Sequence, residues 1–181
     1  RNSQYSHRQS SMREGKANIA KMVARRIPDG SSVFIDIGTT AAAVAQELLE
    51  TRKDLRIVTT SLNIAMMMAA GQDFEVTIVG GQVRLADFGV FGESAVEALG
   101  QFKVDFGIIG ISGIDPDGTL LDFDHREVRI ARVVIANSRT VYLVADHSKF
   151  GRPAMVKVGQ LSQVNVLFLD RLPGGVYDEA K

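Results

Sequence analysis

Two hydroxyls and a glycine follow the first apolar run of the sequence, residues 33–37, where a helical pattern begins. They belong to Gly38, Thr39 and Thr40, and Asp36 lies just before them. A glycine permits a tight turn, and the N–H groups of a first helical turn favour an anion. We expect this segment to bind phosphate, with Asp36 beside it; simple capping of the helix is the alternative. No Walker or GxGxxG motif is present.

The second and third apolar runs end in similar polar residues. Thr59 and Ser61 close the second run and open another helical pattern. Gly80 and Gly81 follow the third, and Arg84 comes three residues later. Paired glycines let a backbone approach a ligand, and an arginine can meet an anion. Helix capping by the hydroxyls and a plain turn with a surface arginine are the alternatives.

Acidic residues gather after the fourth run. Gly110 and Asp115 lie in a glycine-rich turn, and Asp122 and Glu127 follow. We expect these residues to accept hydrogen bonds from the hydroxyls of a polyol. A structural alternative is a capping box, with Asp124 at the N-cap and Glu127 three residues on. The spacing fits neither an EF-hand nor a zinc motif, so no metal site is predicted.

The fifth run ends in Asp-His-Ser-Lys, and its Lys149 is well placed to pair with a phosphate. The carboxyl ends of parallel strands lie at one edge of a sheet, where ligands bind. Five such ends together offer hydroxyls, glycines, two cations and carboxylates. This combination suits a small phosphorylated polyol better than a coenzyme, and no cofactor is predicted.

Apolar runs alternate with helical patterns through most of the chain. The runs are rich in Val, Ile, Leu and Phe without strict alternation, which is typical of strands covered on both faces. Alternating strands and helices predict right-handed βαβ units and a three-layer, mostly parallel α/β sheet. We expect strands over 33–37, 55–60, 74–79, 104–111, 141–145 and 164–169, and helices over 13–27, 40–49, 62–70, 93–99 and 124–136.

Charge is unevenly spread along the 181 residues, although 21 Lys and Arg balance 21 Asp and Glu. Residues 1–26 carry seven basic residues against one acid, a net charge of +6, and the remainder carries −6. A neutral total argues against a nucleic-acid surface spread over the whole domain. Disulfides and cysteine-based zinc sites are excluded because there is no cysteine. No apolar run approaches the roughly 20 residues that span a bilayer.

Four segments of the chain resemble the effector-binding domain of DeoR-family bacterial repressors. They are residues 36–40, 80–84, 110–115 and 146–151, which occur there in the same order. The resemblance implies a fold similar to that of ribose-5-phosphate isomerase and related sugar-phosphate-binding proteins. It also implies a phosphorylated sugar or polyol as effector, with glycerol 3-phosphate favoured, and relief of repression of catabolic genes when the effector binds.

The comparison with the isomerase assigns roles to matching positions. Gly38, Thr39 and Thr40 resemble its phosphate loop, and Lys149 resembles the lysine that meets the phosphate. Glu127 lies where the isomerase has its glutamate base, which leaves a sugar-phosphate isomerase as the alternative function. The acidic stretch of the isomerase is replaced by residues 113–117, and its glycine-rich lysine segment is missing. A base without its partners isomerises poorly, so we expect Glu127 to bind and no enzyme activity.

The resemblance also predicts how the chain is organised. Residues 1–12 are polar and Ser-rich, and we expect them to form a linker or extended arm before a sensor domain over 13–181. The family's N-terminal helix-turn-helix is not among these residues, so operator DNA is expected to be contacted only through that other domain. A cytoplasmic homo-oligomer, dimer or tetramer, with no membrane contact is expected.

Overall fold

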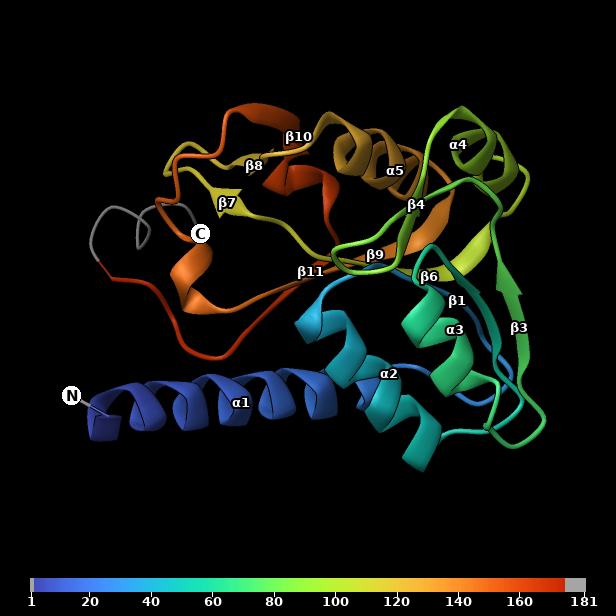
Figure 1. Ribbon diagram of the computed structural model, residues 1–181, viewed down its shortest axis with the longest axis horizontal. Coiled ribbons are helices and arrows are strands. Elements are labelled where there is room, and N and C mark those ends of the chain that lie inside the picture. The colour runs from blue at the N-terminus through green and yellow to red at the C-terminus, as the bar shows by residue number, and fades with distance from the viewer. Residues whose placement is uncertain (1, 175–181) are drawn as a thin grey trace.

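A six-stranded parallel sheet forms the centre of the computed structural model, which describes residues 2–174. The strand order is β11-β9-β6-β1-β2-β3, and every neighbouring pair is parallel (Figure 1). Its strands coincide with the six predicted ones, apart from differences at their ends. They are β1 (Ser32–Ile35), β2 (Arg56–Thr59), β3 (Glu75–Ile78), β6 (Val104–Ile109), β9 (Ser138–Ala145) and β11 (Val166–Leu169).

Helices cover both faces of this sheet. Val33 and Ile35 of β1 are buried in one apolar cluster with helices α1, α2 and α3, whereas Phe34 is buried in a second cluster with α4 and α5. Side chains of a strand alternate between faces, so one strand supplies both cores. The three-layer α/β prediction is confirmed. The helices are α1 (Asn2–Arg25), α2 (Thr39–Thr51), α3 (Leu62–Met68), α4 (Glu93–Leu99) and α5 (His125–Ala136).

The N-terminal segment differs from its prediction. Residues 2–12 are not an extended arm, because one helix, α1, runs from Asn2 to Arg25. Hydrophobic periodicity marks only the part of a helix that has a buried face, and among the described side chains of α1 the first buried position is Gly15. Between residues 2 and 14 there is no Gly or Pro to end a helix. The N-terminal half of α1 extends past the end of α2 (Figure 1).

Short antiparallel elements also escaped the sequence analysis. A hairpin of β4 (Gln82–Arg84) and β5 (Gly89–Phe91) follows β3, and a three-stranded sheet has the order β10-β8-β7. With two to five residues each, these strands are too short for a periodic pattern. The sheet consists of β7 (Gly113–Ile114), β8 (Thr119–Asp122) and β10 (Val156–Gln160); two 3₁₀ turns are η1 (His147–Lys149) and η2 (Leu161–Gln163).

The order of the central strands determines where a crevice opens. β1 lies between β2 and β6, so the chain leaves β1 toward one side and returns to its other side at β6. Open α/β sheets bind ligands at such a switch point, outside the carboxyl ends of the strands. Here Asp36 follows β1 and Gly110 follows β6, and the Asp36 carboxylate accepts a hydrogen bond from the Gly110 N–H at 3.2 Å. Within residues 2–174, no helix has the length and apolar character needed to cross a membrane.

Candidate functional site

A pocket of about 210 Å³ opens at this switch point. It is smaller than the roughly 300–1,000 Å³ of pockets that hold drug-sized ligands. Eight of the predicted site residues line it, from four different segments of the chain. They are Asp36, Gly38, Thr39, Thr40, Gly110, Asp122, Glu127 and Lys149, joined by Ile37, Ala41, Asp87, Ile111, Ser112, Ala131, Val144 and Asp146.

The β1–α2 turn presents the first turn of a helix to the pocket. Gly38 is the N-cap of α2 and has a φ of 113°, a conformation that favours glycine. Its carbonyl accepts the Ala42 N–H at 2.9 Å, and no side chain caps this helix. The capping alternative for Thr39 and Thr40 is therefore wrong. Both hydroxyls and the N–H groups of the first turn lie at the pocket, where the positive end of the helix dipole favours an anion.

Asp36 forms the base of the pocket between β1 and β6. Its carboxylate accepts hydrogen bonds from the N–H groups of Ile37, at 2.8 Å, and Gly110, at 3.2 Å. The pKa of Asp36 is raised to about 7, mainly by burial and also by the nearby Asp122, while these two hydrogen bonds act to lower it. Asp36 therefore changes its charge near neutral pH.

A second pair of carboxyl groups lies on the opposite wall. Asp122, at the end of β8, accepts hydrogen bonds from the Ser112 hydroxyl at 2.9 Å and the Phe123 N–H at 2.7 Å. Glu127, in the first turn of α5, is paired with Asp122. Burial and this pairing raise the pKa of Glu127 to about 8. At pH 7 Glu127 holds a proton, so the wall offers both a donor and acceptors to a hydroxyl group.

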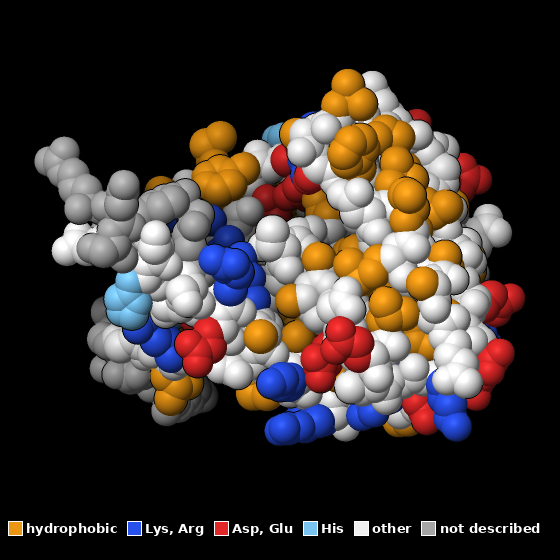
Figure 2. Space-filling model, turned by 60° about the horizontal axis from the view of Figure 1, so that its bottom comes forward, with side chains coloured by type: hydrophobic (Ala, Val, Ile, Leu, Met, Phe, Trp, Pro, Cys, Tyr) orange, Lys and Arg blue, Asp and Glu red, His pale blue; other side chains and the backbone are white. Residues whose placement is uncertain are grey.

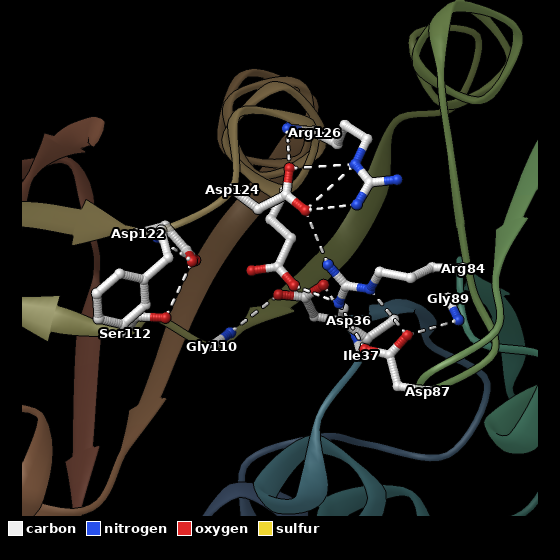
Figure 3. A network of polar contacts seen from close by, with 12 residues as sticks. Asp36, Ile37, Arg84, Asp87, Gly89, Gly110, Ser112, Asp122, Asp124 and Arg126 are labelled. Atoms are coloured by element: carbon white, nitrogen blue, oxygen red, sulfur yellow. Dashed lines mark hydrogen bonds and ion pairs between the residues drawn. The ribbon is translucent and has the colours of Figure 1, made fainter. Parts of the chain in front are cut away.

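Arg84 does not face the pocket as a free cation. Its guanidinium donates to Asp87 at 2.5 Å, to Glu127 at 2.5 Å and to Asp124 at 3.0 Å (Figure 3). Its centre also lies 4.5 Å from the centroid of the Phe91 ring. Hydrogen bonding to Asp87 contributes most to holding the pKa of Arg84 above its usual range. Arg84 thus joins the β4–β5 hairpin to α5 through the carboxyl groups of Asp87, Asp124 and Glu127.

Asp124 is the N-cap of α5, as the structural alternative predicted, but the rest of the capping box is absent there. Its carboxylate accepts the Arg126 N–H at 2.8 Å, and hydrogen bonding to the Arg126 side chain lowers the pKa of Asp124 to about 2. The Glu127 side chain turns to Arg84 and not to the backbone of Asp124. No group of His, Asp and Glu side chains over residues 2–174 is arranged to hold a metal ion.

Lys149 forms the other end of the pocket. It ends the turn η1, whose N-cap Asp146 accepts the Ser148 N–H at 2.8 Å. Burial lowers the pKa of Lys149, the neighbouring Asp146 opposes this, and the charges of Arg152 and Lys16 lower it further. Lys149 therefore has two further cations in its surroundings, and one of them, Lys16, is hydrogen-bonded to Thr39 in the first turn of α2.

The two ends of the pocket differ in charge. Lys149 and the first turn of α2 make one end cationic, whereas Asp36, Asp122 and Glu127 make the other acidic. On the face drawn in Figure 2, Lys and Arg side chains gather at the edge of a hollow that has acidic side chains behind it. Such a pocket matches a small molecule with an anionic group at one end and hydroxyl groups at the other.

Besides Arg84, five predicted site residues do not line the pocket. The Thr59 hydroxyl is buried and donates to the Ile35 carbonyl at 2.7 Å, and the Ser61 hydroxyl accepts the Ile64 N–H as the N-cap of α3. Gly81 allows close approach of the hairpin, since a Cβ there would lie 2.5 Å from the Phe91 carbonyl. Gly80 precedes the same hairpin, and Asp115 closes the β7–β8 turn through its backbone. None of these five residues is part of the pocket lining.

Sequence reasoning missed other residues of the pocket. Asp146 lies within the Asp-His-Ser-Lys segment and could have been found there. Asp87 and Ser112 lacked such a signal. Asp87 comes from the turn of a hairpin that was not predicted, and Ser112 is recognisable only through its bond to Asp122.

Comparison with known proteins places this geometry in a family. Residues 11–171 match the profile of the DeoR C-terminal sensor domain. The chain belongs to this family. It is 49% identical to the glycerol-3-phosphate regulon repressor of Escherichia coli K12 over 172 aligned residues. The alignment covers 95% of this chain and 68% of that protein. The corresponding repressor of Haemophilus influenzae is 48% identical over 99% of this chain and 70% of that protein. The predicted DeoR resemblance is confirmed.

Solved structures agree on the fold of this DeoR sensor domain. A ribose-5-phosphate isomerase in complex with phospho-erythronic acid has a TM-score of 0.56 at 17% identity, over 76% of this chain and 54% of that one. The eIF2B beta–delta tetramer of C. thermophilum reaches a TM-score of 0.66 at 12% identity, over 97% of this chain and 63% of that one. At such low identity the likeness concerns the fold alone, and it confirms the predicted isomerase-like fold.

Proposed function

We propose that this sensor domain binds a small phosphorylated polyol, glycerol 3-phosphate, in the pocket at the β1–β6 switch point, and that binding relieves repression. The division of the pocket into a cationic end and an acidic end carries the proposal. The names of the two relatives that are 49% and 48% identical support glycerol 3-phosphate as the ester.

Each part of the ligand has a matching part of the pocket. The phosphate meets the N–H groups of the first α2 turn, the hydroxyls of Thr39 and Thr40, and the Lys149 ammonium. The glycerol hydroxyls meet Asp36, Asp122 and Glu127, which together hold donor and acceptor capacity. We assign the phosphate to Gly38, Thr39, Thr40 and Lys149 on this basis.

Isomerase-like catalysis is the second candidate, favoured by the raised pKa of Glu127, about 8. We propose sensing without turnover. A general base must reach the proton it removes, whereas the Glu127 carboxyl is held by Arg84 at 2.5 Å and paired with Asp122. Incubation with ribose 5-phosphate tests this, and conversion at rates of about 1 per second or more would establish the enzyme instead.

Calorimetry on the purified chain tests the binding proposal. Glycerol 3-phosphate should bind, and glycerol should not bind at comparable concentration, because the phosphate supplies most of the charged contacts. Lys149→Ala should weaken binding roughly 10- to 100-fold, since a hydrogen bond to a charged group contributes about 1.5–3 kcal/mol. Lys157→Ala is the control, because that lysine is exposed on β10 and does not line the pocket. Equal affinity of wild type and Lys149→Ala would remove the phosphate assignment.

Relief of repression requires partners beyond the ligand. We propose that the sensor domain assembles as a dimer or tetramer, and that effector binding shifts the population of arrangements that can place DNA-binding domains on an operator. Sedimentation analysis with and without glycerol 3-phosphate tests the assembly, and a monomer in both conditions contradicts it.

A further inference from the structure

Helix α1 contacts the cationic end of the pocket through one side chain. The Lys16 ammonium donates a hydrogen bond of 2.7 Å to the Thr39 hydroxyl, in the first turn of α2. An ammonium has three donors, and Thr39 accepts one of them. Lys16 therefore stands beside the place where the proposed phosphate lies, although it belongs to a helix outside the pocket.

A backbone contact ties α1 to the opposite side of the same end. Gly15 lies so close to Asp170 that a Cβ on the glycine would be 3.0 Å from the Asp170 Cβ. The Asp170 carboxylate in turn accepts the His147 N–H at 2.8 Å and contacts the His147 Nδ1 at 2.7 Å. His147 opens the turn that ends at Lys149. Of two consecutive residues of α1, Lys16 thus contacts the first turn of α2 directly, and Gly15 approaches η1 indirectly, through Asp170.

The charges at this end favour an anion between them. Lys16, Lys149 and Arg152 are close enough for the first and third to depress the pKa of the second. Asp146 and, to a smaller extent, Asp122 offset the charge of Lys149, and Asp146 is already hydrogen-bonded to Ser148. A phosphate dianion here would reduce the repulsion among the three cations.

The packing of α1 changes at the same point. From Gly15 onward its inner face is buried, and Ile19, Ala20 and Val23 pack with α2. Before Gly15 the described side chains are exposed or, at Met12, half-buried. With a rise of about 1.5 Å per residue, the segment from residue 2 to 14 is roughly 20 Å long. A small rotation at Gly15 and Lys16 would therefore become a larger displacement at the N-terminal end of α1.

We propose that Lys16 couples the pocket to α1: it donates to the phosphate of the bound ester as well as to Thr39, and its engagement shifts the orientation of the N-terminal half of α1. This inference rests on the proposed binding of a phosphate ester. The hydrogen bonds of Lys16 would then communicate whether the pocket is occupied, because ligand binding shifts the population of α1 orientations. By reciprocity, a substitution that uncouples α1 from the pocket must also change the affinity for the effector.

Hydrogen exchange and calorimetry on the whole chain test the proposal together. In the wild type, glycerol 3-phosphate should change amide exchange over residues 2–14. Lys16→Met keeps the side-chain length and helix propensity, and it should weaken binding at least about tenfold. At saturating ligand, the exchange response of residues 2–14 should be lost in this variant, while residues 38–42 still respond. Lys21→Met is the control, because Lys21 is an exposed lysine of the same helix, and both readouts should match the wild type.

Specific outcomes overturn the proposal. Affinity of Lys16→Met within about twofold of wild type excludes contact with the phosphate, and an undiminished α1 response at saturation excludes coupling through Lys16. Thermal unfolding of each variant near the wild-type temperature excludes misfolding as the cause of a loss. If the wild type binds inorganic phosphate but not glycerol 3-phosphate, the proposed effector is wrong while Lys16 is still tested with phosphate. Binding of neither by the wild type contradicts both proposals.

Discussion

Arg84→Met removes the cation that joins the β4–β5 hairpin to helix α5. Arg84 contacts three carboxylates, those of Asp87, Asp124 and Glu127, and its side chain is 20% exposed. Methionine retains an apolar stem against Phe91, so the variant isolates the loss of charge from the loss of packing. The expected result is a destabilised protein whose destabilisation increases with pH.

The magnitude follows from which carboxylates are ionised. Asp87 and Asp124 are partly exposed, at 40% and 25% of the side chain, so losing their partner costs about 1 kcal/mol. Glu127, with a pKa of about 8, holds its proton at about pH 6 and adds little there. Removing Arg84 raises this pKa further. Above about pH 8 the wild type gains the ionised Arg84–Glu127 pair and the variant does not, so the cost increases to about 3 kcal/mol.

Urea unfolding followed by circular dichroism at about pH 6 and about pH 9 measures these differences. Arg126→Met is the matched control. Arg126 also contacts Asp124 and lies 5.3 Å from the Phe91 centroid, but its side chain is 48% exposed. The control should destabilise the protein less than Arg84→Met does at both pH values, because exposed ion pairs contribute little. An Arg84→Met cost that is equal at the two pH values, or that matches Arg126→Met, would refute the assignment of Glu127 as the group that Arg84 holds.

Two further predictions concern the pocket itself. In calorimetry, the affinity for glycerol 3-phosphate should fall about tenfold from about pH 6.5 to about pH 9. The reason is that Asp36 and Glu127, with pKa values of about 7 and about 8, lose protons and then repel the anion. In Glu127→Gln the fall should be smaller, and a fall equal to that of the wild type contradicts the role of Glu127. Gly38→Ala should cost about 1–3 kcal/mol in thermal unfolding and weaken binding, because φ is +113° there. Gly80→Ala, at a glycine without positive φ and with nothing within 4 Å of a new Cβ, is the control and should change neither measurement.

Local patterns were sufficient for the main elements and for the position of the site. The parallel strands were recognisable because they are short apolar runs, and the inner ones are largely buried on both faces, as in β1, whereas the edge strand β3 is partly exposed. Chain order then placed residues 36–40 and Lys149 at the carboxyl ends of strands, where the pocket lies. The extension of α1 to Asn2 left no such pattern, since its described side chains before Gly15 are not buried.

Only the tertiary structure decided what each polar residue does. Arg84 and Glu127 are 43 positions apart, and their pairing depends on a hairpin too short to predict. Asp115 and Asp122 are the same residue type, yet Asp122 lines the pocket and accepts the Ser112 hydroxyl, whereas the Asp115 backbone closes the β7–β8 turn. In the sequence, Lys16 is one of seven basic residues within residues 1–26, whereas in the structure the packing of α1 on α2 brings its ammonium to the Thr39 hydroxyl. The residue types indicate a phosphate and hydroxyl groups, but the folded distances alone determine which side chains are paired with one another and which face the ligand.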